Sequence, residues 1–322
     1  MPLSPPRYPL RTPRVLFLFC LLSFSGTAAR LFLSELAKSS YWASVNPAMI
    51  TNMVGSAVAG LLVGRGSSLS VEHGFEADAH YALMLGFCSC CTTFGTTMTH
   101  AAMVLATPED VALPDPPGGG SWNAWADSTF SLAMTFFVSF SSYRLLHPFG
   151  SSLSLAGRLP ASLCLATLLM PLAAGAVYVC VKGGVNGSLS SLNWGRVASV
   201  LASPLGSIPR ALLSSWLNSN GRRVLFMSNF GTFLCNVLGT FICASMTYVV
   251  LDDGFSISLY AVNEGISGSL STVSTYVCEV EKEKTKAGVR KYTMSRDMYV
   301  YVVATFGVGL ASGVLGLKAG GL

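Results

Sequence analysis

The sequence predicts an all-α integral membrane protein, in which two inverted four-helix repeats are joined by a single linker transmembrane helix to give nine spans. Composition is the first observation behind this prediction, because only 11% of the 322 residues are charged and 51% are hydrophobic, whereas soluble proteins carry about 25% charged residues. The second observation is a series of apolar runs of membrane-spanning length. The third is a set of motifs that recurs in the second half of the chain.

Nine apolar stretches reach the length of about 20 residues that an α-helical span needs. They are residues 14–36, 44–64, 79–105, 124–146, 157–181, 193–217, 224–250, 256–279 and 298–317. The first stretch also fits a cleaved signal peptide, because Arg11 and Arg14 precede the apolar run VLFLFCLLSF and a small-residue segment. Its similarity to the sixth stretch favours a membrane helix instead.

The basic residues lie mainly in short loops between the apolar runs, so the net charge of +5 sets topology and does not indicate nucleic-acid binding. With nine spans, fourteen lysines and arginines fall on the side of the N-terminus and four on the other side. Because positive loops stay in the cytoplasm, we expect a cytoplasmic N-terminus and an extracellular C-terminus. The N-x-S/T sequon at Asn186 then lies outside.

Three sequence blocks occur twice in the same order. The form N-x-x-G-[ST] occurs at Asn52 and Asn236, SGTAARLFLSELA resembles LGSIPRALLSSWL, and GFCSCCTTFGTT from Gly86 resembles GISGSLSTVSTY from Gly265. The fifth stretch has no counterpart, and one helix between two even units inverts the second unit relative to the first. The predicted domains are an N-terminal tail at 1–13, repeats at 14–150 and 191–322, and the linker helix at 151–190.

Glycine, serine, threonine and cysteine dominate the third block, which predicts a break in each helix at Ser89–Thr92 and at Gly268–Ser271. Backbone carbonyls freed within a membrane must face protein or water. Two such breaks meeting at the repeat axis would offer carbonyl oxygens to a cation such as Na⁺. The alternative is close helix packing by small residues, without an ion.

Uncharged hydrogen-bond donors are what the predicted spans offer to a transported ion. The donors and ring edges that suit a small, dehydrated anion are Asn52, Asn236, Phe94, Tyr276, a hydroxyl stripe of Ser131, Thr135 and Ser139, and its shorter counterpart Tyr301 and Thr305. Helix-to-helix hydrogen bonding is the alternative role of the stripe. Carboxylates such as Asp127, Glu264 and Glu279 lie at or near predicted helix ends, so we expect no proton relay, and no enzyme motif occurs.

The cysteine cluster Cys88, Cys90 and Cys91 could offer soft metal ligands together with His100. No second CxxC or HxxxH motif accompanies it. Small residues at a helix crossing are therefore the preferred interpretation.

Taken together, these blocks resemble the Fluc/CrcB family of fluoride channels, and the fused double-unit form resembles the eukaryotic FEX-type fluoride exporters. The family signature, approximately GFxGGxTTFSTF, is matched by Thr92, Thr93 and Phe94 in the first repeat and by Gly265, Gly268, Thr272, Ser274 and Thr275 in the second. The resemblance implies pore asparagines at Asn52 and Asn236, first-helix arginines at Arg30 and Arg210, and an acidic position at Glu279, where the first repeat has His100. It also implies a structural Na⁺ bound by the carbonyls of Ser89, Thr92, Gly268 and Ser271.

The resemblance further implies two pores, each lined by one signature aromatic position from each repeat. Phe94 pairs with Tyr276 in one pore, whereas Val273 and Thr97 leave the other without a ring, so we expect one conducting pore and one vestigial pore. The implied function is passive, fluoride-selective export from the cytosol across the plasma membrane by a lipid-embedded monomer. The rivals are a proton-coupled transporter of small ions or drugs, also built from inverted repeats, and a non-transporting structural or receptor-like membrane protein.

Overall fold

The computed structural model describes residues 10, 12–38, 40, 45–66, 75–106, 121–155, 191–218, 227, 229–254, 256–286 and 296–321. Within these ranges the chain is helical and contains no strand. The expected linker span 157–181, the sequon at Asn186 and nearly all of the expected tail 1–13 lie outside the described residues.

Each of the other eight predicted spans falls on a helix or on a broken helix. The helices are α1 Pro13–Ala37, α3 Met49–Gly66, α4 Phe75–Ala82, η1 Leu83–Cys88, α5 Ser89–Cys91, α6 Phe94–Ala106, α7 Ser121–Leu155, α9 Ser191–Leu217, α10 Phe230–Asp253, α11 Ile257–Tyr260, η2 Ala261–Ser267, α12 Gly268–Leu270, α13 Ser274–Lys286 and α14 Arg296–Gly320. The third and eighth spans are composite: a helix, a π-helical turn, a short helix and, after a break, a second helix.

Local sequence explains where the first helix begins. Thr12 is the N-cap residue, and its hydroxyl accepts a hydrogen bond from the backbone N–H of Val15 at 3.2 Å. Pro13 follows at the first helical position, where its missing N–H leaves no intrahelical bond unmade.

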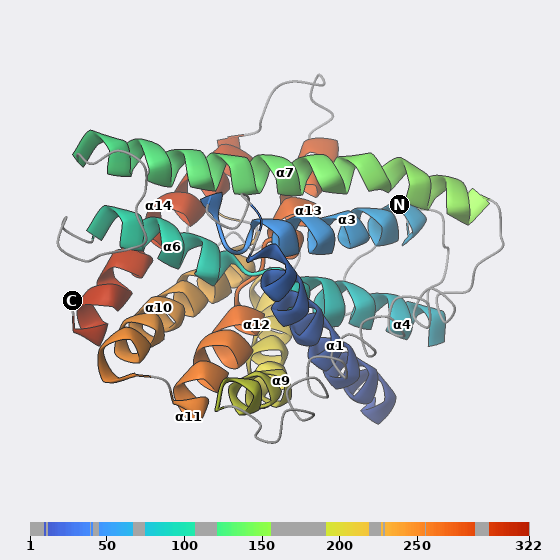
Figure 1. Ribbon diagram of the computed structural model, residues 1–322. Coiled ribbons are helices and arrows are strands. Elements are labelled where there is room, and N and C mark those ends of the chain that lie inside the picture. The colour runs from blue at the N-terminus through green and yellow to red at the C-terminus, as the bar shows by residue number, and fades with distance from the viewer. Residues whose placement is uncertain are drawn as a thin grey trace.

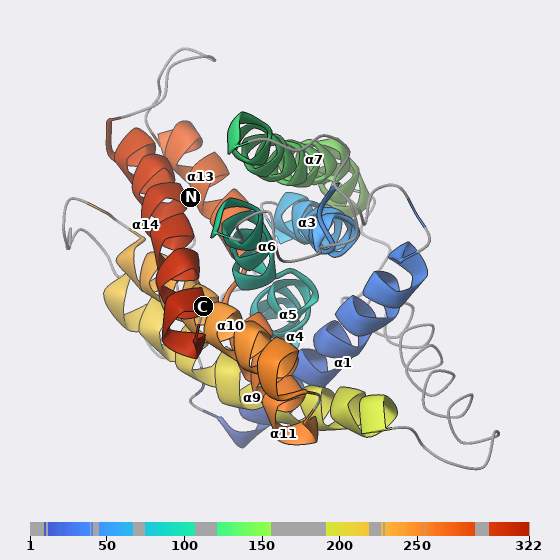
Figure 2. The same cartoon turned by 60° about the vertical axis from the view of Figure 1, so that its left-hand side comes forward.

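The helices α5 and α6 of the first composite helix lie at the centre of the molecule. Figure 2 shows α5 and α6 in the middle, with α1, α3, α7, α10 and α14 around them. In Figure 1, α7 runs along one edge beside α3 and α6, while α9 and α11 lie at the opposite edge. The interior contains many hydroxyls and amides as well as apolar side chains, so polar groups are gathered where the breaks occur.

Glycines bring the outer helices into backbone contact. A Cβ atom at Gly60 or Gly64 on α3 would overlap the carbonyl oxygens of Tyr143 or His147 on α7, and one at Gly316 on α14 would lie 2.6 Å from the carbonyl oxygen of Phe241 on α10. Small residues permit such close approach in membrane helix pairs. The pairs α3–α7 and α10–α14 therefore pack in the same way.

Among the described residues, four helices are long and apolar enough to cross a membrane, namely those at Pro13–Ala37, Leu192–Leu217, Phe230–Asp252 and Arg296–Gly320, and Met49–Arg65 is a shorter apolar helix. The helix boundaries correct the sequence prediction at two places. Helix α7 extends over Ser121–Leu155 rather than 124–146, and α13 continues to Lys286, so that Glu279 lies inside a helix and not at its end. Polar residues extend both helices, and an apolar run does not record where a polar helix ends.

Candidate functional site: two interlocked broken helices

Both predicted helix breaks are present at the expected positions. Thr92 after α5 has φ −99° and ψ 153°, and Ser271 after α12 has φ −90° and ψ 149°. Both residues are extended and fully buried, and α5 contacts α12. The two breaks therefore meet in the interior, as the recurrence of the third block predicts.

Each buried asparagine pairs with the peptide groups of one residue in a break. Asn52 accepts from the Thr93 N–H at 2.8 Å and donates to the Thr93 carbonyl at 3.1 Å. Asn236 accepts from the Thr272 N–H at 2.7 Å and donates to the Thr272 carbonyl at 3.2 Å. Because a buried N–H without a partner is costly, these two amides stabilise the extended segments.

The four carbonyls predicted to bind Na⁺ do not receive the N–H groups that would bond to them in a regular helix. In a regular helix, the carbonyls of Ser89 and Gly268 would accept from the N–H groups of Thr93 and Thr272, but these bond to the asparagines. The carbonyls of Thr92 and Ser271 would accept from the N–H groups of Thr96 and Thr275. These two N–H groups bond instead to the hydroxyls of Thr93 at 3.3 Å and Thr272 at 3.4 Å. The carbonyl oxygens of Ser89, Thr92, Gly268 and Ser271 thus lose their usual helical partners. Uncharged oxygen donors of this kind suit a hard monovalent cation.

The two breaks also cap each other. The hydroxyl oxygen of Thr92 accepts from the N–H groups of Val273 at 3.3 Å and Ser274 at 3.1 Å, at the start of α13. Reciprocally, the hydroxyl oxygen of Ser271 accepts from the N–H of Gly95, at the start of α6, at 2.9 Å. Each second half-helix therefore receives its N-terminal cap from the other broken helix.

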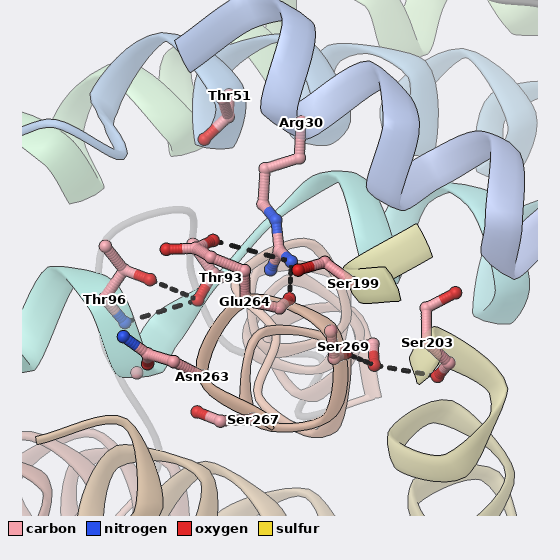
Figure 3. A network of polar contacts seen from close by, with 12 residues as sticks. Arg30, Thr51, Thr93, Thr96, Ser199, Ser203, Asn263, Glu264, Ser267 and Ser269 are labelled. Carbon is pink, nitrogen blue, oxygen red and sulfur yellow. Dashed lines mark hydrogen bonds and ion pairs between the residues drawn. The ribbon is translucent and has the colours of Figure 1, made fainter. Parts of the chain in front are cut away.

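Arg30 and Arg210 are buried side chains at equivalent places on α1 and α9, with exposed fractions of 2% and 1%. Each guanidinium contacts the π-helical turn in the opposite half of the sequence. Arg30 donates to the carbonyl of Glu264 in η2, and Arg210 donates to the carbonyl of Leu85 in η1. Figure 3 shows Arg30 pointing toward Glu264, with Thr93 and Thr96 close by. These contacts join distant parts of the chain.

A cavity of about 250 Å³ opens beside Arg30. Its lining includes Arg30 and Glu264 together with Thr51, Thr93 and Thr96, so it extends to the break that follows α5. At its rim, Glu35 forms ion pairs with Arg196 on α9 and with Lys38, the latter at 2.8 Å. The cavity gives the polar interior a charged opening.

Aromatic rings gather on one side of the breaks. Phe94 and Tyr276, both fully buried, have ring centroids 6.4 Å apart, so the structure brings the predicted pair together. Further rings, which no sequence motif indicates, surround the pair: Phe136 and Phe140 on α7 and Phe306 on α14. Tyr276 also lies 5.4 Å from the ring of Tyr301.

The structure does not join all the predicted pore residues into one group. Asn52 donates to the hydroxyl of Thr97 at 3.0 Å, and Thr97 belongs with Val273 to the vestigial pore that the family resemblance implies. Gly309, the third position of the shorter polar stripe, lies against the Phe94 ring, because a Cβ there would be 2.8 Å from Phe94 Cε1. Therefore α14, with Tyr301 and Gly309, flanks the aromatic pair.

The hydroxyl stripes use their protons within their own helices. Thr135 donates to the Ser131 carbonyl at 2.8 Å, Ser139 to the Thr135 carbonyl at 2.7 Å, and Thr305 to the Tyr301 carbonyl at 2.6 Å. Ser131 in addition accepts from the Asn46 amide at 3.0 Å. An anion could receive hydrogen bonds from Thr135, Ser139 or Thr305 only after these hydroxyls rotate away from their carbonyls.

Glu279 accepts hydrogen bonds from side chains on three other segments. They come from Thr232 on α10 at 2.6 Å, Tyr301 on α14 at 2.7 Å and Asn218 at 3.0 Å. His100, at the equivalent position of the first composite helix, has an Nδ1 atom with no hydrogen-bond partner among the described residues. The sequence alone does not indicate that Asn218 and Thr232 contact Glu279, because both residues are far from Glu279 along the chain.

The cysteine cluster does not support the metal alternative. Cys88, Cys90 and Cys91 are fully buried free thiols. In the described part of the chain, no group of three His, Cys, Asp or Glu side chains is arranged to hold a metal ion.

The fold and this site define a class of protein: an α-helical membrane protein with several spans, built around two interlocked broken helices. Residues 197–317 match the model of the CrcB-like protein family, Camphor Resistance (CrcB). Fluoride export protein 1 of Candida albicans is 32% identical over 133 residues, which cover 37% of this chain and 32% of that protein, so the match spans about a third of the relative's length. No solved structure matches the chain. Over residues 197–317 the chain is therefore similar to the CrcB-like family.

Proposed function

We propose that the protein is a passive, fluoride-selective channel that exports F⁻ from the cytosol through one conducting pore. The observation that carries the proposal is the pair of buried asparagines, Asn52 and Asn236, which bind the backbone of two broken helices beside a ring-lined interior. The similarity to a protein named for fluoride export supports the choice of anion. The same similarity favours transport over catalysis as the role of this protein.

The aromatic side of the interior is the conducting pore in this proposal. Phe94 and Tyr276 present ring edges, which carry a partial positive charge and can face an anion, and α14 contributes Tyr301 and Thr305 beside them. The side with Thr97 and Val273 lacks a ring, and the Thr97 hydroxyl is already engaged with Asn52. We assign the vestigial pore to that side.

A structural Na⁺ is part of the proposal. The residues fit this ion, because the carbonyl oxygens of Ser89, Thr92, Gly268 and Ser271 are released from helical hydrogen bonding by the contacts of the two breaks. Sodium would supply a fixed positive charge between the two composite helices. The chain itself orients the half-helices through the asparagines and the reciprocal caps.

The proposed protein acts as a monomer in the plasma membrane, since its two composite helices already supply both halves of the site. Its N-terminus is cytoplasmic and its C-terminus extracellular. Because the membrane potential is negative inside, it drives F⁻ outward without nucleotide hydrolysis.

Fluoride efflux from proteoliposomes that contain the purified protein tests the proposal. We expect efflux of F⁻ at zero pH gradient, with no matching efflux of Cl⁻. Phe94→Ala should reduce the fluoride rate at least about tenfold, which corresponds to the loss of about 1.4 kcal/mol of stabilisation along the pathway. Val273→Ala, the matched change in the vestigial pore, should leave it within about twofold.

Three results would count against parts of the proposal. Equal chloride flux would remove the selectivity. Flux that needs a proton gradient would point to the proton-coupled transporter. A larger effect of Val273→Ala than of Phe94→Ala would reverse the pore assignment.

A further inference from the structure

The two buried arginines have equivalent positions but different electrostatic surroundings. Arg30 donates to the backbone carbonyl of Glu264, and the Glu264 carboxylate lies 3.8 Å from the same guanidinium nitrogen. Arg210 makes the equivalent bond to the carbonyl of Leu85, whose side chain carries no charge. One guanidinium thus has a neighbouring carboxylate, and the other has leucine in the same place.

Arg210 carries unused hydrogen-bonding capacity inside the protein. Its side chain is 1% exposed, and its Nε and Nη1 atoms have no hydrogen-bond partner among the described residues. The same two atoms of Arg30 also have none, so the two arginines differ in the neighbouring carboxylate and not in the number of unpartnered nitrogens. No ion pair to Arg210 is found within the same part of the chain. A buried charge without a partner is strongly unfavourable, so a counter-ion at this place would stabilise the fold.

A second unpartnered donor lies about one helical turn from the carbonyl that Arg210 contacts, because Tyr81 precedes Leu85 by four residues on the first composite helix. The hydroxyl of Tyr81 is buried without a hydrogen-bond partner among the described residues. The equivalent of Tyr81 in the second composite helix is Tyr260, which lies instead beside the cavity near Arg30 and Glu264.

We propose that Arg210 and Tyr81 form a binding site for a single small monovalent anion, a halide, and that the equivalent place at Arg30 is not such a site because Glu264 occupies the role of the anion. Two guanidinium nitrogens, which carry three N–H groups, and one phenol O–H are donors without acceptors, and a halide accepts several hydrogen bonds while neutralising the charge. The inference deepens the proposed function, since fluoride belongs to this class of anion, and it adds an asymmetry between the two ends of the molecule.

The predicted orientation gives the asymmetry a direction. Arg210 lies toward the end of α9, and Tyr81 toward the start of the first composite helix, and both places face the cytoplasm if the N-terminus is cytoplasmic. Arg30 and Glu264 then face outside. An anion would meet an uncompensated positive charge on the cytoplasmic side and a neutralised one on the other side, which favours capture from the cytosol.

Thermal unfolding of the full-length protein in detergent, followed by the fluorescence of its five tryptophans, tests the site without any flux measurement. The probes are sodium bromide and sodium fluoride, each exchanged against sodium gluconate so that Na⁺ and ionic strength stay constant. We expect the melting temperature of the wild type to rise with either halide and to saturate, as it does when a ligand binds only the folded state.

Two variants at the site and one matched variant at the other end separate this idea from general salt effects. Leu85→Glu places a carboxylate where Glu264 stands at the other end, and it should abolish the halide response. Glu264→Leu creates the uncompensated arrangement at Arg30 and should add a second, weaker response. Tyr81→Phe keeps the charge and should raise the half-maximal halide concentration about tenfold, because one hydrogen bond to the ion is lost.

A wild type without a halide response, or a Leu85→Glu variant with an unchanged response, would overturn the proposal. If Leu85→Glu does not fold, an unchanged half-maximal concentration in Tyr81→Phe would overturn it instead. Halide binding without fluoride flux in proteoliposomes would reject the proposed function and retain this site. Fluoride flux without the halide response would do the reverse.

Discussion

Single hydroxyl and amide groups hold the centre of this protein together. Thr92 and Ser271 cap half-helices that begin in the other composite helix, and Asn52 and Asn236 each bind the backbone of one extended residue. These four side chains are fully buried, so water cannot replace the bonds that they make. We therefore expect their removal to affect stability even where the pore itself is unchanged.

Thr92→Val tests the exchanged caps at the residue scale. Valine keeps the shape of threonine but leaves the N–H groups of Val273 and Ser274 without their acceptor, so we expect a loss of about 1–3 kcal/mol of stability. The measurement is thermal unfolding in detergent. Thr27→Val is the matched control, because the buried Thr27 hydroxyl has no hydrogen-bond partner among the described residues, and this change should be neutral or stabilising. Equal effects of the two changes would contradict the capping role.

Helix pairs at the next scale depend on backbone contact rather than on side-chain volume. On α3, Gly60 meets the backbone of Tyr143, and on α14, Gly316 meets the backbone of Phe241. Association of helices in lipid has no hydrophobic driving force between them, so close packing carries much of the stability. A methyl group added at either glycine would collide with backbone atoms, which cannot move aside as a flexible side chain can.

Gly60→Ala should separate α3 from α7 and destabilise the protein by about 1–3 kcal/mol, the usual effect of overpacking. Size-exclusion chromatography and thermal unfolding would report this as a lower melting temperature. Gly307→Ala serves as its control, since no atom lies within 4 Å of the added Cβ, and alanine is the better helix former by about 0.5–1 kcal/mol. A melting temperature lowered as much by Gly307→Ala would show that contact with α7 is not the cause.

At the scale of the whole molecule, buried hydrogen bonds join the two halves of the sequence. The Thr92–Ser274, Arg30–Glu264 and Arg210–Leu85 hydrogen bonds each join residues more than 100 positions apart. On the surface, Arg144 on α7 donates to Glu281 on α13 at 2.7 Å. The halves are therefore joined both at the buried site and at the periphery.

The predicted inversion requires the termini to lie on opposite sides of the membrane. Epitope tags at each end, probed with a membrane-impermeant protease on intact cells, measure this directly. We expect cleavage of the C-terminal tag and protection of the N-terminal tag until the cells are permeabilised, because fourteen of the loop cations lie on the N-terminal side. Simultaneous cleavage of both tags on intact cells would contradict the nine-span arrangement.

The helical class, the positions of the two breaks and the identity of most residues around them can be predicted from local sequence. Apolar runs and glycine-, serine- and threonine-rich blocks are local signals, and local signals suffice to locate a helix and its interruption. Three features emerge only from the folded chain. Thr92 and Ser271 exchange caps, Glu279 accepts hydrogen bonds from Thr232, Asn218 and Tyr301, and Arg210 contacts Leu85 where Arg30 contacts Glu264. These contacts join residues far apart along the chain, and hydrogen bonding depends on distance and direction in space, which no spacing along the sequence records.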